Sequence, residues 1–369
     1  MRYYIIAGEK SGDMQGAQLM QAIKQEDPKA IFRYWGGHYM QQEGGTLVVS
    51  YTALAVMGLA FLGKLMQLWK YLKFCKKDIL QFQPDVVILI DYAGFNLRIA
   101  KFAKKQGIKT FYYIAPKVWA WNPSRTHQIK AYVDRLFTIF PFEKAFYQQY
   151  DYQVDYVGNP IVEQVRVHTT NSKFLVTNNL QHRPIIALLP GSRLQEVKQI
   201  LPTMLAIVPS LPEYQFVVVG VAEIPTELYA QANKLPGVLV VYEAMYDVLE
   251  NAYAAVVTSG TATLETACFQ VPQVVVYKTN YFTYILAKLL VKVRYISLVN
   301  IIAGQEIVKE LIQHQCRPKP LLQALQEILQ EAEARQAQLA GYQDIQNLLG
   351  KSKAAKTTAH LMRHYLLKP

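Results

Sequence analysis

The sequence predicts an α/β protein made of two Rossmann-like domains, each with a doubly wound parallel sheet. The first observation behind this prediction is a repeated pattern in which short apolar runs of strand length end at glycine-containing turns and pass into helical segments. The second is a polar, irregular stretch at 163–183, after which the pattern starts again. The third is length, because 369 residues suffice for two domains that each bury a core. We therefore expect an N-terminal domain at 1–164 and a C-terminal domain at 165–345.

Composition and charge limit the class of protein. Hydrophobic residues make up 51% of the chain and charged residues 18%, which is typical of a globular protein and excludes a disordered one. The formal net charge of +12 suits either nucleic acid or an anionic membrane surface. Because no RNA- or DNA-binding motif is present, we expect a membrane surface, and no nucleic acid, as the partner.

The cysteines and the N-terminus indicate the compartment. Cys75, Cys268 and Cys316 lie far apart, with neither metal-binding spacing nor a disulfide framework, so we expect a reducing compartment and no metal. The first residues, MRYYIIAGEKSGD, begin with a strand and lack the apolar region of a signal peptide. No uncharged apolar run reaches the roughly 18 to 20 residues of a spanning helix. We therefore expect the protein to stay in the cytoplasm.

The first predicted strand, at 3–7, leads into a polar loop at 8–13 and a helix at 15–24. Glu9 and Asp13 make this loop negatively charged, which favours a role in catalysis or in binding a sugar acceptor over a role in binding diphosphate. A second strand at 32–36 ends near His38, which could act as a base, although a loop histidine is more often incidental.

The segment 53–77 combines apolar side chains with a rim of lysines. This pattern is expected of a helix that lies in a membrane interface, with Phe61, Leu65 and Trp69 as its membrane-binding residues. The alternative is a helix that faces the core. Aromatic side chains that look exposed, and two glycines that weaken the helix, favour the interface.

Asp91 follows a buried-type strand at 85–90, and so lies where open α/β sheets bind their ligands. A carboxylate at that point can orient or deprotonate a sugar hydroxyl, and Gly94 lets an acceptor come close. The alternative is an N-cap for the helix at 94–105. We prefer Asp91 as the base over Glu9, Asp13 and His38.

The N-terminal sheet continues with strands at 110–114, 136–140 and 154–157. After the first of these, Trp119 and Trp121 stand in a proline-led loop. Their flat rings could bind a sugar or an acyl chain, and packing between domains is an equally good use for them.

The C-terminal domain begins with a strand at 185–189, a Gly191-Ser192-Arg193 turn and a helix that runs to residue 200. Free N–H groups at the helix start, the serine hydroxyl and the guanidinium together suit a phosphate. The alternative is an ordinary turn with a surface arginine.

A second junction of this kind follows a strand at 254–258. Ser259, Gly260 and Thr261 form the turn, and Glu265 lies in the helix at 262–268, where it could accept from ribose hydroxyls. The alternative for Glu265 is a charge favoured by the helix dipole. Two such turns in one domain can face one ligand.

The rest of the C-terminal half supplies further strands, at 216–219, 238–241 and 273–276, and a basic, apolar segment at 281–293. A polar loop follows at 300–306. Two helices are expected, at 320–339 and 351–366.

With these residues in hand, the chain resembles the lipid-A-disaccharide synthase family of glycosyltransferases along nearly its whole length. The order and spacing of the short motifs carry the resemblance. They are GEKSGD at 8–13, VMGL at 56–59, DYAGFN at 91–96, APKVWAW at 115–121, PFEKAFY at 141–147, VGNP at 157–160, LPGSR at 189–193, SGTATLE at 259–265 and NIIAG at 300–304.

The resemblance implies a GT-B fold, in which two Rossmann-like domains face each other across a cleft and a C-terminal helix at 346–369 crosses back to the N-terminal domain. It implies that UDP-2,3-diacylglucosamine is joined to 2,3-diacylglucosamine 1-phosphate, called lipid X, to give UDP and a β-1,6-linked disaccharide. It also implies inversion, no metal and no other cofactor, work at the inner face of the cytoplasmic membrane, and leaves a homodimer open. The sequence departs from the family at Lys10, Lys117, Asn159 and His38, which puts acceptor details and acyl-chain preference in doubt.

The resemblance and the turns together assign residues to roles. The residues expected to hold the UDP-sugar are Gly191, Ser192, Arg193, Ser259, Gly260, Thr261, Glu265 and Asn300. The residues expected to bind the acceptor are Gly12, Asp13, Asn96 and Trp119, and those expected to take part in catalysis are Asp91, Glu9 and Ser11.

Other functions stay open at this point. A UDP-N-acetylglucosamine 2-epimerase shares the fold and the diphosphate grip, and a membrane-associated nucleotide-binding protein would bind UDP without turnover. A dinucleotide oxidoreductase is disfavoured, because no G-x-G-x-x-G follows the first strand.

Overall fold

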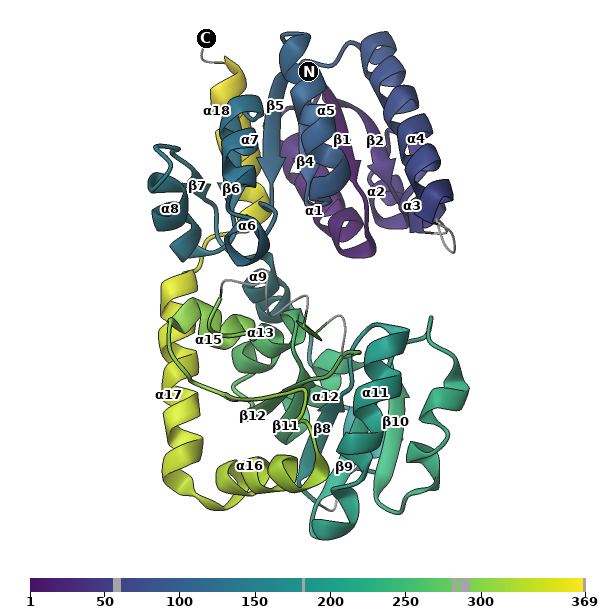
Figure 1. Ribbon diagram of the computed structural model, residues 1–369, viewed down its shortest axis with the longest axis vertical. Coiled ribbons are helices and arrows are strands. Elements are labelled where there is room, and N and C mark those ends of the chain that lie inside the picture. The colour runs from purple at the N-terminus through teal and green to yellow at the C-terminus, as the bar shows by residue number, and fades with distance from the viewer. Residues whose placement is uncertain (56–60, 181–182, 281–283, 286–292, 368–369) are drawn as a thin grey trace. The chain divides into compact units, whose positions relative to one another are not determined.

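The computed structural model describes residues 1–55, 61–180, 183–280, 284–285 and 293–367. The chain divides into two compact units (Figure 1): unit 1 is Met1–Pro160 with Lys351–Pro369, and unit 2 is Ile161–Gly350. Each unit is a parallel sheet with helices on both faces, which confirms the predicted pair of Rossmann-like domains.

Unit 1 contains a seven-stranded parallel sheet in the order β3-β2-β1-β4-β5-β6-β7. The strands are β1 (Arg2–Ala7), β2 (Ile31–Gly36), β3 (Thr46–Ser50), β4 (Val86–Ile90), β5 (Lys109–Tyr113), β6 (Arg135–Thr138) and β7 (Asp155–Tyr156). The helices are α1 (Lys10–Glu26), α2 (His38–Gln42), α3 (Tyr51–Ala55), α4 (Phe61–Phe82), α5 (Ala93–Lys105), α6 (Val118–Trp121), α7 (Arg125–Tyr132), α8 (Pro141–Gln148) and α18 (Ala354–Leu367).

Helices cover both faces of this sheet. Successive side chains of a strand point to opposite faces, so the side chains on both faces are buried. Tyr4 and Ile6 of β1 face the core under α4, α5 and α7, whereas Tyr3 and Ile5 face the core under α1 and α18. Helix α18 packs against α1, so the C-terminal helix belongs to the N-terminal domain, as expected (Figure 1). The uniformly apolar strands follow from this double covering.

Unit 2 contains a six-stranded parallel sheet in the order β10-β9-β8-β11-β12-β13. The strands are β8 (Ile185–Leu189), β9 (Gln215–Gly220), β10 (Val238–Tyr242), β11 (Ala252–Thr258), β12 (Gln273–Tyr277) and β13 (Lys309–Ile312). The α-helices are α9 (Pro160–Arg166), α10 (Phe174–Thr177), α11 (Leu194–Leu205), α12 (Met245–Asn251), α13 (Thr261–Cys268), α15 (Leu298–Ala303), α16 (Pro318–Gln330) and α17 (Ala332–Leu349), with 3₁₀ turns at Val208–Ser210, Thr226–Tyr229 and Ala232–Lys234.

Several predicted elements need correction. Helix α1 begins at Lys10 and not at residue 15, so residues 11–13 belong to its first turns and not to a loop. His38 is likewise the first residue of α2. The helix expected at 320–339 is two helices, α16 and α17, because the chain is extended at Glu331 (φ −93°, ψ 107°).

Other predictions fall partly outside the described residues. The expected helix at 53–77 is seen as α3 and as α4, which runs on to Phe82, and 56–60 lie outside the described part. Most of the segment 281–293 lies outside it too. None of the described helices combines the length and the hydropathy needed to cross a bilayer.

Candidate functional site

The order of strands in unit 1 reverses between β1 and β4, which are neighbours in the sheet. In open α/β sheets ligands bind outside the carboxyl ends of the strands at such a switch point. The loop after β1 holds Glu9, and the loop after β4 begins at Asp91. The two loops touch, because a Cβ atom at Gly8 would collide with the ring of Tyr92. The sheet thus brings Glu9 and Asp91 to one point.

The backbone of Asp91 is held in an uncommon conformation. Asp91 and Tyr92 both have left-handed backbones, with φ of 44° and 48°. The Asn96 amide donates to the carbonyls of Ile90 (3.1 Å) and Asp91 (2.8 Å), and the Tyr112 hydroxyl also donates to the Asp91 carbonyl. Left-handed non-glycine residues cost on the order of 1–3 kcal/mol each and cluster at functional sites. The Asn96 side chain therefore holds Asp91 in place through the backbone carbonyl of Asp91.

The helix-cap alternative for Asp91 does not match the geometry. The N-cap of α5 is Tyr92, and the side chain of this residue makes no capping hydrogen bond. Asp91 therefore lies before the capping position, directly after the carboxyl end of β4.

The carboxyl groups of Asp91 and Glu9 influence each other. Asp91 is exposed as a residue, yet the protein around its carboxyl group removes enough water to raise its pKa, and the negative charge of Glu9 raises it further. The ammonium group of Lys117 and a backbone hydrogen bond from Tyr92 act in the opposite direction. A raised pKa makes Asp91 a stronger base than an ordinary aspartate. Lys117 belongs to this electrostatic group, and the sequence reasoning gave it no role there.

The residues expected beside this point in α1 differ in their accessibility. Ser11 is exposed in the first turn of α1. Gly12 is buried, and a Cβ there would lie 3.3 Å from that of Ala7, so it serves close packing of the helix on β1.

Asp13 is fully buried and holds the start of α2. Its carboxylate accepts three backbone N–H bonds, from Gly37 (2.6 Å), Tyr39 (3.0 Å) and Met40 (3.1 Å). His38 is exposed, and its Nε2 atom lies 3.0 Å from the Gln42 amide. We therefore give Asp13 a structural task, the satisfaction of free helix N–H groups.

Trp119 packs inside unit 1. Its indole N–H donates to Glu143 Oε1 (3.1 Å), its ring meets Phe142 edge-on at 5.0 Å, and the residue is 8% exposed. Glu143 Oε2 accepts from the N–H groups of Ile139 (3.2 Å) and Phe140 (3.1 Å). Burial raises the pKa of Glu143 to about 7. Glu143 was missed from the sequence, and its hydrogen bonds tie Trp119, which lies in the short helix α6 and not in the predicted loop, to the backbone at Ile139 and Phe140.

Unit 2 has its own switch point, between β8 and β11. These strands pair directly, with Leu189 beside Val257, so the turns at 190–193 and 259–261 emerge side by side at the carboxyl ends. This arrangement is the one expected for two turns that face one ligand.

The first turn already contains a carboxylate. Gly191 has φ of 111°, and a Cβ there would lie 2.5 Å from Glu196 Oε2. That oxygen accepts from the N–H groups of Ser192 (3.1 Å) and Arg193 (3.3 Å), and Glu196 Oε1 pairs with the guanidinium at 3.0 Å. Glu196 thus occupies the position expected for a phosphate at the start of α11, while the Arg193 side chain stays 79% exposed. The sequence signal for Glu196 is an acid three residues after the N-cap.

The second turn is open. Gly260 and Thr261 are exposed, and apart from the adjoining residues no atom of the described part of the chain lies within 4 Å of a Cβ built at Gly260, so a ligand can approach the backbone there. The Ser259 hydroxyl donates to the Ile296 carbonyl at 2.8 Å. Glu265 accepts from the Tyr246 hydroxyl at 2.9 Å, and burial raises the pKa of its carboxyl group.

Asn300 is buried and shapes the segment behind this turn. Its Oδ1 atom accepts from the N–H groups of Ile307 (2.7 Å) and Val308 (2.9 Å). Its Nδ2 atom donates to the Val308 carbonyl (2.8 Å) and to Glu310 (2.9 Å), and Glu310 also accepts from the Ser297 hydroxyl. Asn300 therefore supports the segment that holds Ser259.

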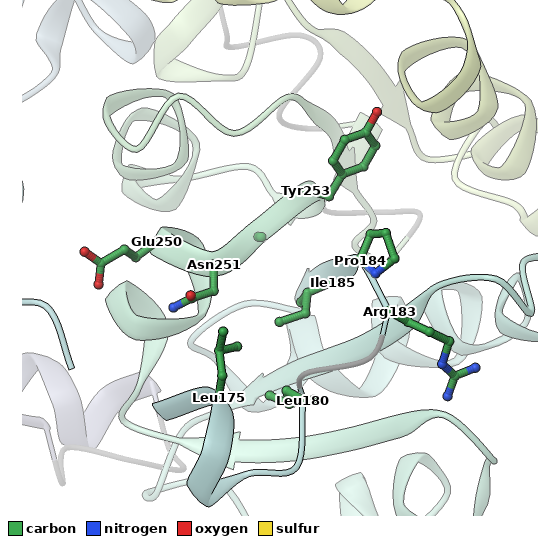
Figure 2. Close-up of a pocket in the computed structure, with 9 residues that line it drawn as sticks. Leu175, Leu180, Arg183, Pro184, Ile185, Glu250, Asn251 and Tyr253 are labelled. Carbon is green, nitrogen blue, oxygen red and sulfur yellow. The ribbon is translucent and has the colours of Figure 1, made fainter. Parts of the chain in front are cut away.

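A cavity of about 370 Å³ lies elsewhere in unit 2, at the amino ends of β8 and β11 (Figure 2). Leu175, Leu180 and Ile185 line it, and Arg183 and Glu250 lie on opposite sides. Because the two turns stand at the carboxyl ends of the same strands, this cavity is not where they would bind a ligand.

Helix α4 has a buried face and an exposed apolar one. Leu72, Cys75 and Ile79 are buried against the sheet, so part of this helix faces the core. Met66 and Trp69 are 66% and 65% exposed. The side chains of Phe61 and Leu65 lie outside the described part.

Comparison with known proteins gives one family. Residues 3–363 match the family model described as lipid-A-disaccharide synthetase. The lipid-A-disaccharide synthase of Trichlorobacter lovleyi is 37% identical over 98% of this chain and 96% of its own. That of Syntrophus aciditrophicus is 38% identical over 96% and 95%.

Solved structures show the same fold at low identity. A UDP-GlcNAc 2-epimerase from Neisseria meningitidis, bound to UDP-GlcNAc, matches with a TM-score of 0.68 and 12% identity over all of both chains. The glycotransferase of kitacinnamycin matches with a TM-score of 0.68 and 12% identity over 99% of each chain. At this identity the likeness shows the fold alone.

Proposed function

Since the chain belongs to the lipid-A-disaccharide synthase family, we propose that it joins UDP-2,3-diacylglucosamine to lipid X, 2,3-diacylglucosamine 1-phosphate, and releases UDP. The observation that carries this function is the family match, which spans residues 3–363 and so includes both sheets. The epimerase alternative has only the shared fold in its support.

In the proposed reaction the acceptor 6-hydroxyl attacks the anomeric carbon of the donor from the face opposite UDP. A carbon–oxygen bond forms to the acceptor, the bond to the β-phosphate breaks, and the hydroxyl proton passes to a carboxylate. We assign that carboxylate to Asp91, because its raised pKa and fixed backbone suit a base. Glu9 raises the pKa of Asp91 by its charge, and Lys117 limits the rise.

The leaving diphosphate needs positive charge, which unit 2 can supply without a metal. The exposed Arg193 guanidinium and the open backbone at Gly260 and Thr261 are the proposed donors. The hydrogen bond from the Arg193 guanidinium to Glu196 must break before all the donors of the guanidinium can bind phosphate. Glu265 lies one turn into α13, where it could accept from the ribose.

We also propose that α4 brings the protein to the inner face of the cytoplasmic membrane. Both substrates carry acyl chains, and each buried methylene is worth about 0.8 kcal/mol, so the enzyme must come to the lipid. Met66 and Trp69 offer exposed apolar surface, and Lys70 and Lys73 stand exposed beside them for anionic headgroups.

The test of this function is a reaction of the purified protein with both lipid substrates in detergent micelles containing EDTA. UDP release is followed by a coupled assay, and the disaccharide by mass spectrometry, with each substrate omitted in turn as a control. We expect UDP and disaccharide in equal amounts only when both lipids are present. A parallel reaction receives UDP-GlcNAc alone. Its epimerisation at carbon 2, with no disaccharide formed from the lipids, would replace this function by the epimerase, and UDP binding without either product would indicate a nucleotide-binding protein.

A further inference from the structure

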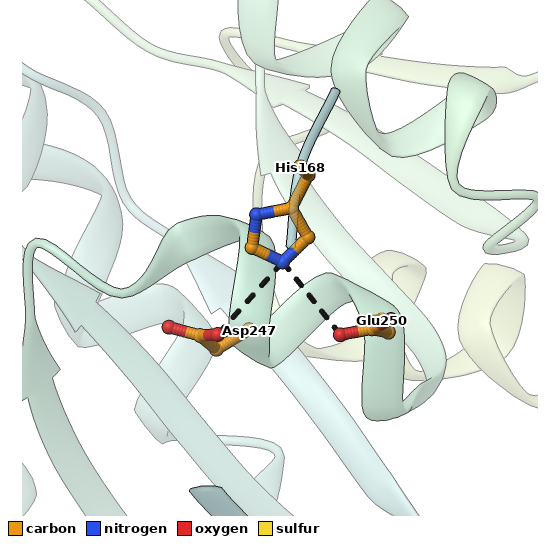
Figure 3. A group of neighbouring side chains, drawn as sticks. All are labelled: His168, Asp247 and Glu250. Atoms are coloured by element: carbon orange, nitrogen blue, oxygen red, sulfur yellow. Dashed lines mark ion pairs between the residues drawn. The ribbon is translucent and has the colours of Figure 1, made fainter. Parts of the chain in front are cut away.

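Three potential metal ligands to which the transfer reaction gave no role converge in unit 2 (Figure 3). His168 follows α9, and Asp247 and Glu250 lie three residues apart on α12. The His168 Nε2 atom lies 3.8 Å from Asp247 Oδ1 and 3.6 Å from Glu250 Oε2, and the three ligand atoms all lie within 4.8 Å of one another.

These distances leave the imidazole nitrogen without a hydrogen bond. An N–H···O bond spans about 2.7–3.2 Å, which is shorter than either separation. The His168 Nε2 atom is buried and has no hydrogen-bond partner among the described residues, although it points at both carboxylates (Figure 3). An unsatisfied buried polar atom is unfavourable, so the geometry calls for a group between the imidazole and the carboxylates.

A divalent cation fits that position. Metal ions such as Zn²⁺ bind nitrogen and carboxylate oxygen at about 2.0–2.2 Å, which places ligand atoms roughly 3–3.5 Å apart. The separations of 3.8 Å and 3.6 Å between the imidazole nitrogen and the carboxylate oxygens need to contract by about 0.1–0.8 Å to reach that range, and the two carboxylate oxygens must close from a separation within 4.8 Å. Two carboxylates and a neutral imidazole also balance the charge of the ion.

The surroundings orient the ligands. The imidazole meets the rings of Tyr246 and Phe269 edge-on, at 5.5 Å and 5.8 Å. The second oxygen of Glu250 accepts from the Thr170 hydroxyl. Supporting contacts of this kind fix the direction of metal ligands. The three side chains are 17%, 21% and 28% exposed, in the order His168, Asp247, Glu250, so an ion and its water ligands can reach them.

We propose that His168, Asp247 and Glu250 bind one divalent transition-metal ion through Nε2 and one oxygen of each carboxylate. One imidazole with two carboxylates suits Zn²⁺, Mn²⁺ or Fe²⁺, whereas Mg²⁺ and Ca²⁺ prefer oxygen alone. The ion takes no part in sugar transfer. The ion links the segment after α9 to α12. Tyr246 is next to Asp247 and its hydroxyl donates to Glu265, so metal binding also restrains the position of Glu265.

Metal titration of the full-length protein tests the proposal. After treatment with EDTA and its removal, Zn²⁺ and, separately, Mn²⁺ are titrated by calorimetry, and bound metal is counted by elemental analysis. We expect one ion per chain at this site. Asp247→Asn and His168→Gln should weaken binding by more than the roughly 10- to 100-fold that loss of a supporting contact causes. The control His314→Gln, which changes an exposed histidine of the same unit, should bind as the wild type does.

Hydrogen exchange supplies a second measurement that does not depend on the variants. Added metal should slow exchange in residues 167–171 and in α12 of the wild-type protein, and should leave α16 unchanged. The proposal is overturned if no stoichiometric binding is found, which would make the cluster a set of neighbouring side chains that holds no ion. It is equally overturned if Asp247→Asn and His168→Gln, shown by circular dichroism to be folded, bind as tightly as the control.

Discussion

The buried carboxyl group of Glu143 should make unit 1 less stable as pH rises. Its pKa is raised from an ordinary 4.5 to about 7, and the residue is 1% exposed, so solvent screens the effect little. Below pH 4.5 the group is protonated in both the folded and the unfolded chain, and its contribution to stability is fully present. As pH rises from 4.5 towards 7, the carboxyl group of Glu143 ionises in the unfolded chain but stays protonated in the folded chain, so the free energy of unfolding falls. The shift of about 2.5 units corresponds to roughly 3 kcal/mol, of which about 2.5 kcal/mol is lost between pH 5 and pH 8.5.

The substitution Glu143→Gln removes this pH dependence while it keeps the shape of the side chain. Urea unfolding at several pH values measures it, with tryptophan fluorescence as the signal, because all four tryptophans of the chain lie in unit 1. The free energy of unfolding of the wild type minus that of the variant should fall by about 2.5 kcal/mol from pH 5 to pH 8.5. Titrations of other groups cancel in this difference. A difference that stays constant would mean that Trp119 and the two backbone donors keep Glu143 ionised, and would refute the raised pKa.

Two further predictions concern the donor site and the membrane. Arg193→Ala should raise the barrier to transfer by about 2–4 kcal/mol, measured as a fall in kcat/KM, because it removes a donor to the developing charge on the β-phosphate; near-normal turnover would show that phosphate is bound elsewhere. Replacing Met66 and Trp69 by Ser should weaken flotation with phosphatidylglycerol vesicles by roughly 30-fold, since about 2 kcal/mol of apolar burial is lost. Ile31→Ser, at a residue 57% exposed in the same unit, is the matched control, and equal binding by both variants would favour a helix that only faces the core.

The central strands were predictable because both faces of each sheet are covered. Strand β8 occupies Ile185–Leu189 as expected, and β4 occupies Val86–Ile90 within the expected 85–90. Strands β3 and β13 were missed, and both lie at sheet edges. An edge strand such as β13, Lys309–Ile312, carries charged residues and lacks the apolar run that marks a central strand.

The sequence predicted which residues lie at the carboxyl ends of the strands. It did not predict the direction in which their side chains point. A polar residue in a turn can face a ligand or the backbone, and the sequence does not distinguish the two. Asp13 and Asn300 face backbone N–H groups inside their units. Tyr112 reaches the Asp91 carbonyl across 21 residues of sequence, so only tertiary contact reveals its part in holding that loop.

The kinetics of Asp91→Asn test the central claim of the account most directly. The amide keeps the shape of the side chain and removes the basic lone pair and the charge. With both lipid substrates present, kcat should fall by about 10²- to 10⁴-fold, while the affinity for UDP, measured by calorimetry, should change little. Loss of UDP affinity would contradict the account. So would near-normal turnover of Asp91→Asn beside a Glu9→Gln variant that binds UDP and does not turn over, since Glu9 would then be the base.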